Sequence, residues 1–261
     1  MKNLLAKSIL IAGAIGLAGN ALALDWQTNE IHVQQGVLDI PSYAGGGSED
    51  VFIGTLQHAS GWKYGDTFAF VDYSQGSDQG HDIYGEIYAN FSLSKISGKD
   101  VSFGIVKDVG ILAGYNYGKE GGVRKYLPGV RLALDVPGFS FLNVDTTAYI
   151  DDNMGGGGDR APTEDDSFMV DINWAYPFSL GDHSFSIEGH IEYIGSRDNE
   201  YGGKVSHHVL AQPQIRYDLG KTLMGQSDKL FVGVEFQLWQ NKYGDNATDE
   251  RATQFLGVYR F

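Results

Sequence analysis

RATQFLGVYRF, residues 251–261, is the stretch of sequence that decides the fold. Its alternate residues Phe255, Gly257, Tyr259 and Phe261 form an uncharged, mostly aromatic face, whereas the residues between them include Arg260. A period of two is typical of a β-strand whose faces meet different environments. In a soluble protein such an aromatic strand at a sheet edge would invite aggregation, but in a closed membrane barrel it pairs with the first strand. We therefore predict an antiparallel transmembrane β-barrel.

The first residues have the pattern of an export signal. Lys2 and Lys7 provide a basic start, residues 8–18 are apolar, and positions 21–23 read Ala-Leu-Ala, a small-x-small cleavage site. The apolar run is shorter than the roughly 20 residues that a membrane-spanning helix needs, although an uncleaved anchor helix is the alternative. We expect a cleaved signal peptide over residues 1–23 and an exported barrel over residues 24–261.

The composition narrows the class of protein. The chain has 33 acidic and 19 basic residues and a formal net charge of -14, which argues against nucleic-acid binding because that needs a basic surface. The mean hydropathy of -0.22 would suit a soluble protein, but in a membrane barrel only alternate residues face lipid. Cysteine is absent from the sequence, so no disulfide can stabilise the fold.

Strand-like segments follow one another along the whole mature chain. We count about twelve, most of them long enough to cross a bilayer when tilted. Pro128 and Pro213 fall inside two of them and predict local irregularities, because proline cannot donate a ladder hydrogen bond. The predicted strands are residues 28–37, 50–59, 65–74, 82–94, 103–117, 124–135, 139–150, 167–179, 184–196, 207–219, 229–241 and 251–261.

The connections alternate in character. Those after the odd-numbered strands are mostly long, Gly-rich and acidic, as in residues 151–166, and those after the even-numbered strands are mostly tight, as in residues 136–138. Outer-membrane barrels have short periplasmic turns and longer extracellular loops. An even strand count then places both termini on the periplasmic side, and the pattern predicts location in a bacterial outer membrane.

Four predicted strands separate apolar from charged residues most clearly. In residues 82–94, 167–179, 184–196 and 229–241, the apolar alternate positions carry no charge. A lipid-facing Arg or Lys at the bilayer midplane costs about 2–4 kcal/mol, so a charge-free face is expected there. The alternative is a soluble β-sandwich, whose core face is also uncharged.

The polar alternate positions predict the walls of a narrow lumen. Aromatic rings and carboxylates together suit a neutral, planar, polar solute that binds weakly, while the acidic excess disfavours anions such as nucleotides. The alternative is that these charges merely pair with one another inside the barrel. The candidate solute-binding residues are Tyr84, Glu86, Tyr88, Arg131, Asp145, Asp171, Glu188, Glu192, Arg216, Phe231, Glu235 and Trp239.

Other sequence signals do not indicate chemistry. The glycine run at 155–158, followed by Asp159, lacks the Lys-Ser/Thr of a P-loop and the spacing of an EF-hand, so we expect an external loop. His207 and His208 are adjacent in a predicted strand and point to opposite faces, which disfavours a shared metal site. A nucleophile motif is also missing. We expect no cofactor, no metal and no enzymatic activity.

Residues 84–108, YGEIYANFSLSKISGKDVSFGIVKD, resemble a hairpin of the Tsx-type nucleoside-specific channels and their OmpK-type relatives. The similar parts are Glu86, residues 91–95 and residues 100–104, preceded by Trp62 and residues 65–72. The resemblance is clearest over residues 52–117. It implies a twelve-stranded outer-membrane barrel with a narrow, flattened lumen and nucleoside uptake through aromatic and ionisable residues, of which only Glu86 lies on a matched position.

The resemblance also implies partners. Members of this family serve as phage or colicin receptors through their external loops, and outer-membrane barrels use the terminal aromatic strand, here ending at Phe261, as a signal to the assembly machinery. Outer-membrane lipid and lipopolysaccharide would surround the barrel. Two other functions remain open from the sequence: a receptor barrel with an occluded lumen, and a non-selective small porin.

Overall fold

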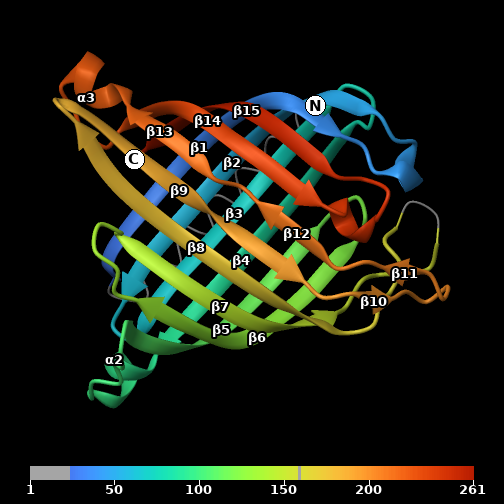
Figure 1. Ribbon diagram of the computed structural model, residues 1–261, viewed down its shortest axis with the longest axis horizontal. Helices are drawn as coiled ribbons and strands as arrows, with labels where there is room; N and C mark the ends of the chain where they lie inside the picture. Colours follow the sequence, from blue (N-terminus) through green and yellow to red (C-terminus); the bar gives the residue numbers. More distant parts are fainter. Residues whose placement is uncertain (1–23, 158–159) are drawn as a thin grey trace.

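The computed structural model describes residues 24–157 and 160–261, which form a closed antiparallel β-barrel (Figure 1). The closure is made by β1 (Leu24–Asp39), which pairs on one side with β2 (Ser48–Trp62) and on the other with the last strand, β15 (Glu250–Arg260). The predicted signal peptide lies outside the described residues. The remaining long strands are β3 (Gly65–Gly76), β4 (His81–Ser92), β5 (Val106–Gly118), β6 (Val123–Leu134), β7 (Phe141–Asp151), β8 (Ser167–Leu180), β9 (His183–Ile194) and β14 (Leu230–Gln240).

The tenth wall segment is interrupted where the sequence predicted an irregularity. It consists of β12 (His208–Ala211) and β13 (Gln214–Asp218), separated by Gln212 and Pro213. Both pieces pair with β9 and β14, and the register with each neighbour is the same before and after the interruption. The barrel therefore has 12 wall strands, as predicted. A separate hairpin, β10 (Arg197–Asp198) with β11 (Lys204–Val205), lies outside the wall.

Pro128 causes a smaller disturbance. It keeps its place opposite Ala113 of β5, but on the other side of β6 the pairing with β7 stops at Tyr126 and resumes at Gly129. The register is unchanged across this gap. The proline therefore interrupts one ladder without bending the strand out of the wall.

Short helices replace parts of the predicted strands and turns. The strand predicted over 82–94 is wrong at its end, because β4 stops at Ser92, whose hydroxyl accepts a 3.1 Å hydrogen bond from the Lys95 amide and caps α2 (Leu93–Ser97). The next strand begins at Val106 rather than at residue 103. A second helix, α3 (Leu219–Met224), is capped by Asp218 in the connection predicted as a turn.

The two ends of the barrel differ in structure, as Figure 1 shows. The helical end carries α2, α3 and the C-terminus, and the opposite loop end carries β10, β11 and the short 3-10 helices η1 (Ser42–Ala44) and η2 (Lys242–Gly244). The predicted difference in loop length holds only as a tendency. The connections 77–80 and 119–122 at the loop end are shorter than the helix-bearing connection 93–105 at the helical end.

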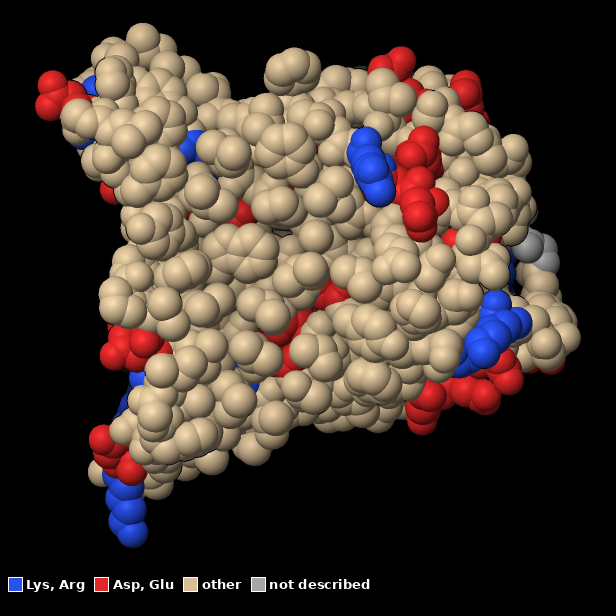
Figure 2. All heavy atoms as spheres, in the orientation of Figure 1, with Lys and Arg blue, Asp and Glu red and all other residues tan. Residues whose placement is uncertain are grey.

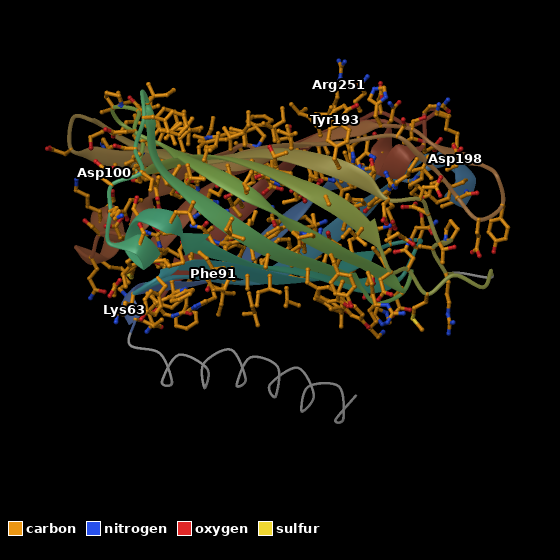
Figure 3. The ribbon with its side chains drawn as sticks, turned by 90° about the horizontal axis from the view of Figure 1, so that it is seen from below. Lys63, Phe91, Asp100, Tyr193, Asp198 and Arg251 are labelled. Carbon is orange, nitrogen blue, oxygen red and sulfur yellow. The ribbon has the colours of Figure 1, made fainter. Side chains whose placement is uncertain are left out.

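The outer wall is apolar and is bordered by aromatic residues. In Figure 2 the charged groups of the visible face gather mostly towards its ends, and few occur over its middle. Figure 3 places Phe91 and Tyr193 on the wall, with Lys63 at the helical end and Asp198 at the loop end. Aromatic pairs follow both rims, Trp62 with Phe91 near the helical end and Phe168 with Tyr193 near the loop end. This is the arrangement that membrane interfaces favour.

The predicted lipid-facing register is confirmed. The exposed side chains on the outside of the barrel include Ile87, Ile187, Ile191, Leu238 and Phe255. Among residues 24–157 and 160–261, no helix is both long enough and apolar enough to cross a membrane.

Candidate lumen site

The predicted lumen residues all belong to the inward register, but they do not form one site. Phe231 lies at the helical end, packed with Leu256 and Val258, and Trp239 lies at the loop end beside Lys242. The others fall into an ion-paired layer near the helical end and a layer in the middle of the barrel. The ion-paired layer contains Arg131, Asp145, Arg216 and Glu188, and the middle layer contains Tyr84, Glu86, Tyr88, Asp171, Glu192 and Glu235.

Arg131 on β6 connects strands that are not neighbours. Its Nε and Nη2 donate to both carboxylate oxygens of Asp145 on β7, at 2.8 and 2.7 Å, and its Nη1 donates to Asp66 on β3 at 2.9 Å. The residue opposite Arg131 on β5 is Gly110, which has no side chain to obstruct this reach. Asn90 completes the group by donating to the other oxygen of Asp66 at 2.7 Å. A bidentate charge-assisted pair of this kind holds both side chains in fixed positions.

Arg216 on β13 forms the matching connection on the other side of the barrel. Its Nη1 lies 3.2 Å from Glu30 on β1 and 3.2 Å from Glu188 on β9. The buried Glu30 carboxylate also accepts from Arg260 at 2.7 Å and contacts the His32 ring at 2.8 Å. Here too a glycine, Gly233, lies opposite the arginine on the adjacent strand. The carboxylates of this layer therefore have cationic partners, as the pairing alternative predicted.

A chain of hydrogen bonds that includes His190 joins the two layers. The ring Nδ1 lies 3.0 Å from Asp171 and Nε2 lies 2.9 Å from the side-chain oxygen of Gln212. The Gln212 amide nitrogen donates in turn to Gln237 at 2.9 Å. Asn173 donates to Asp171 at 2.7 Å and to Asp145 at 3.2 Å, which links His190 to the arginine layer. The His190 ring therefore bridges Asp171 and Gln212, with one ring nitrogen facing each of them.

Glu86 is the centre of the aromatic part of the middle layer. Its Oε1 accepts from the Tyr84 hydroxyl at 2.5 Å and from the Asn116 amide at 2.9 Å, and Asn116 accepts from Tyr88 at 3.2 Å. The other oxygen of Glu86 has no hydrogen bond to the residues that the structure describes. The same holds for both carboxylate oxygens of Glu192. These oxygens are available to accept hydrogen bonds from a solute.

Asp171, His190 and Glu192 have potential ligand atoms within 4.8 Å of one another. A metal ion bound there would have to break a hydrogen bond of His190, because both of its ring nitrogens are already engaged. The chemistry of this group is therefore closer to a hydrogen-bonded charge cluster than to a prepared metal site.

At the loop end, ion pairs between loop and strand residues lie above an apolar cluster inside the barrel. Glu164, from the loop after β7, accepts from Lys125 at 2.7 Å and from Arg197 at 2.6 Å. Burial tends to raise the pKa of Glu164, but Arg197 and Lys125 outweigh it and hold the pKa below its ordinary value. This carboxylate stabilises the loop above its ordinary pKa, and the contribution is lost as the pH falls through the lowered value. Beneath it, Tyr88 packs against Leu127, Tyr149, Met169 and Ile194.

A barrel with a polar, partly ion-paired lumen and lipid-facing outer wall fits the family comparison. The model of the family described as "Nucleoside-specific channel-forming protein, Tsx" matches residues 23–260. The chain belongs to this Tsx family. The match confirms the resemblance predicted from residues 84–108, and it makes the protein an outer-membrane channel.

The chain is also similar to individual known proteins. The Tsx-family chain is 24% identical over 262 residues to outer membrane protein OmpK of Vibrio parahaemolyticus, covering 93% of this chain and 91% of the relative. Among solved structures, a NanC porin aligns with a TM-score of 0.50 at 12% identity, covering 88% of this chain and 98% of the porin. A KdgM porin aligns with a TM-score of 0.46 at 11% identity, covering 89% and 99% of the two chains. At these identities the structural likeness to NanC concerns the fold alone.

The sequence prediction missed several lumen residues of this Tsx-family barrel. Asp66 and Glu30, which accept from the two arginines, were omitted, as were Asn116 and His190. Strand alternation could have found Glu30. Ile31 and Val33 face outward, and Glu30 is one and three positions before them, so its side chain must point into the barrel. Nothing in the sequence indicated that Asp66 on β3 would meet Arg131 on β6.

Proposed function

We propose that this channel passes nucleosides, binding them weakly at the middle layer during diffusion. The observation that carries the proposal is the placing of Glu86 between Tyr84 and Tyr88 on the lumen side of β4, with one carboxylate oxygen free. A base can stack on a tyrosine ring, and the hydroxyl or amino groups of a nucleoside can donate to the free oxygens of Glu86 and Glu192. The family's description as nucleoside-specific supports the same solute class.

The proposed binding is weak for a physical reason. Base stacking on an aromatic side chain contributes roughly 1–3 kcal/mol. A few such contacts correspond to millimolar affinity, which allows a solute to leave as readily as it enters. A nucleotide adds a phosphate whose negative charge would meet the carboxylates of Glu86 and Glu192. The proposal therefore predicts that nucleosides bind in the lumen better than nucleotides, and better than sugars of similar size.

Adenosine or thymidine at millimolar concentration should reduce the ion current through single channels in planar bilayers. A nucleoside in the middle layer would occupy the path that the ions use. Liposomes containing the protein should take up nucleosides faster than the corresponding nucleotides. The proposal fails if nucleosides leave the current unchanged, and equal uptake of sugars and nucleosides would instead indicate a non-selective porin.

The ring of Tyr84 can be tested with a matched pair of variants. Tyr84→Leu removes the stacking surface and should raise the nucleoside concentration that halves the current by about tenfold, within the range expected for one stacked base. Tyr84→Phe removes only the hydroxyl that donates to Glu86 and should raise it by less than about threefold, since the stacking surface remains. If both variants had the same effect, the ring would not contribute by stacking.

A further inference from the structure

Four carboxylates in the middle of the barrel differ from those near the helical end in having no Lys or Arg partner. Among the described residues, Asp72, Glu86, Glu192 and Glu235 form no ion pair with Lys or Arg, whereas Asp145, Glu30 and Glu188 do. The unpaired carboxylates come from the neighbouring strands β3 and β4 and from β9 and β14, which both border β12 and β13. They therefore face the lumen from two sides, and we call them the lumen carboxylates.

The hydrogen-bond donors that contact the lumen carboxylates are neutral. The Thr55 hydroxyl donates to Asp72 at 2.6 Å, and the Gln214 amide donates to Glu235 at 2.5 Å. Neutral donors orient a carboxylate but leave its charge in place. A nitrogen of the His190 ring lies within 4.8 Å of a Glu192 oxygen, but the hydrogen-bond contacts of the ring are with Asp171 and Gln212.

One buried acceptor beside Glu235 has no hydrogen-bond donor. Gln254 is fully buried on β15, and its amide nitrogen donates to Glu235 at 3.0 Å. Its side-chain oxygen Oε1 is buried without a hydrogen-bond partner among the described residues. A buried acceptor without a donor is costly, and so is a group of uncompensated carboxylates. The lumen carboxylates therefore lack Lys or Arg counter-charges, which a cationic solute would supply.

We propose that the lumen carboxylates form a cation-binding ring that makes the channel selective for small cations over anions. The class of ligand is a monovalent inorganic cation or the ammonium group of a small organic solute. Rings of Asp and Glu side chains produce such selectivity in other channels, because they lower the energy of a cation in the pore and raise that of an anion. This goes beyond nucleoside transport and does not depend on it.

The test is the reversal potential of single channels in a potassium chloride gradient. Wild-type protein should show a potassium-to-chloride permeability ratio of about ten, since uncompensated charges act strongly in a narrow lumen. Glu86→Gln and Glu192→Gln should each lower the ratio several-fold, and the double variant should bring it close to one. Glu120→Gln is the matched control, because it removes the same charge from an exposed position in the connection between β5 and β6 and should leave the ratio unchanged.

The outcomes separate this proposal from the nucleoside proposal. A wild-type ratio near one, an absence of conduction, or an unchanged ratio in the double variant would each overturn the cation ring. The last result would mean that the carboxylates hold protons rather than cations. A potassium preference without any effect of adenosine would leave the ring standing and remove the nucleoside proposal. Migration of unboiled protein on a gel confirms in each case that the variant is folded.

Discussion

Replacing Arg131 with methionine is expected to lower the free energy of unfolding by about 3–5 kcal/mol. The change keeps most of the side-chain length but leaves Asp145, whose side chain is 5% exposed, without its bidentate partner. Asp66 loses its cation as well. Breaking a buried pair from one side is far more costly than losing the pair altogether, because the remaining charge stays desolvated. Urea titration of the protein in lipid vesicles, followed by tryptophan fluorescence, measures the difference.

A control variant and a rescue make this prediction specific. Arg124 is on the same strand, but its side chain is 34% exposed and lies 3.6 Å from Asp152 at the loop end. Arg124→Met should therefore cost less than about 1 kcal/mol. Adding Asp145→Asn to Arg131→Met should recover part of the loss, because the uncompensated charge is removed. Equal losses at Arg124 and Arg131, or no recovery in the double variant, would show that the buried pair does not hold the layer together.

Replacing Phe255 with arginine is expected to destabilise the folded barrel by about 2–4 kcal/mol. Phe255 is at the centre of β15 and is 76% exposed on the outer wall, where the side chain contacts the hydrocarbon of the bilayer. A guanidinium group at that depth loses its hydration without gaining a partner. The measurements are the folded fraction on an unboiled gel after insertion into vesicles, and a urea titration of the protein that has folded.

The depth of the substitution is the control for this second prediction. Thr253 is the next outward-facing residue of β15 towards the loop end, and the native Arg251 already follows it on the same face. Thr253→Arg should cost no more than about 1 kcal/mol, because the cost falls towards the membrane interface. Equal costs at positions 253 and 255 would contradict the assignment of the β15 centre to the middle of the bilayer.

The sequence predicted the barrel well because its signals are local. Alternation along residues 251–261 and 184–196 depends only on which side of one strand is apolar, and the structure places Phe255 and Ile191 outside and Gln254 and Glu192 inside accordingly. The capped helix after Ser92 was missed because the alternation of apolar and polar residues continues beyond Ser92 and predicts a longer strand. Short helices of this kind are determined by a single cap rather than by a repeated pattern.

The site was harder to predict because it depends on contacts between distant strands. Alternation placed Arg131 and Arg216 in the lumen correctly, but it could not show that Arg131 reaches Asp66 or that Arg216 reaches Glu30. These partners are set by the curvature of the closed wall and by the glycines beside the arginines. Alternation therefore identified lumen residues without showing which carboxylates are neutralised and which are left for a solute.

The pairing of β1 with β15 has a consequence for how the barrel forms. Arg260 and Glu30 are 230 positions apart in the chain, yet their side chains are 2.7 Å apart across this junction. The loop-closure entropy for so distant a contact must be overcome before the contact contributes any energy, which makes such contacts slow to form. Sealing of the cylinder is therefore expected to be a late kinetic step. The Glu30 carboxylate, which no arginine can reach until the two ends meet, would favour the sealed state only after that step is complete.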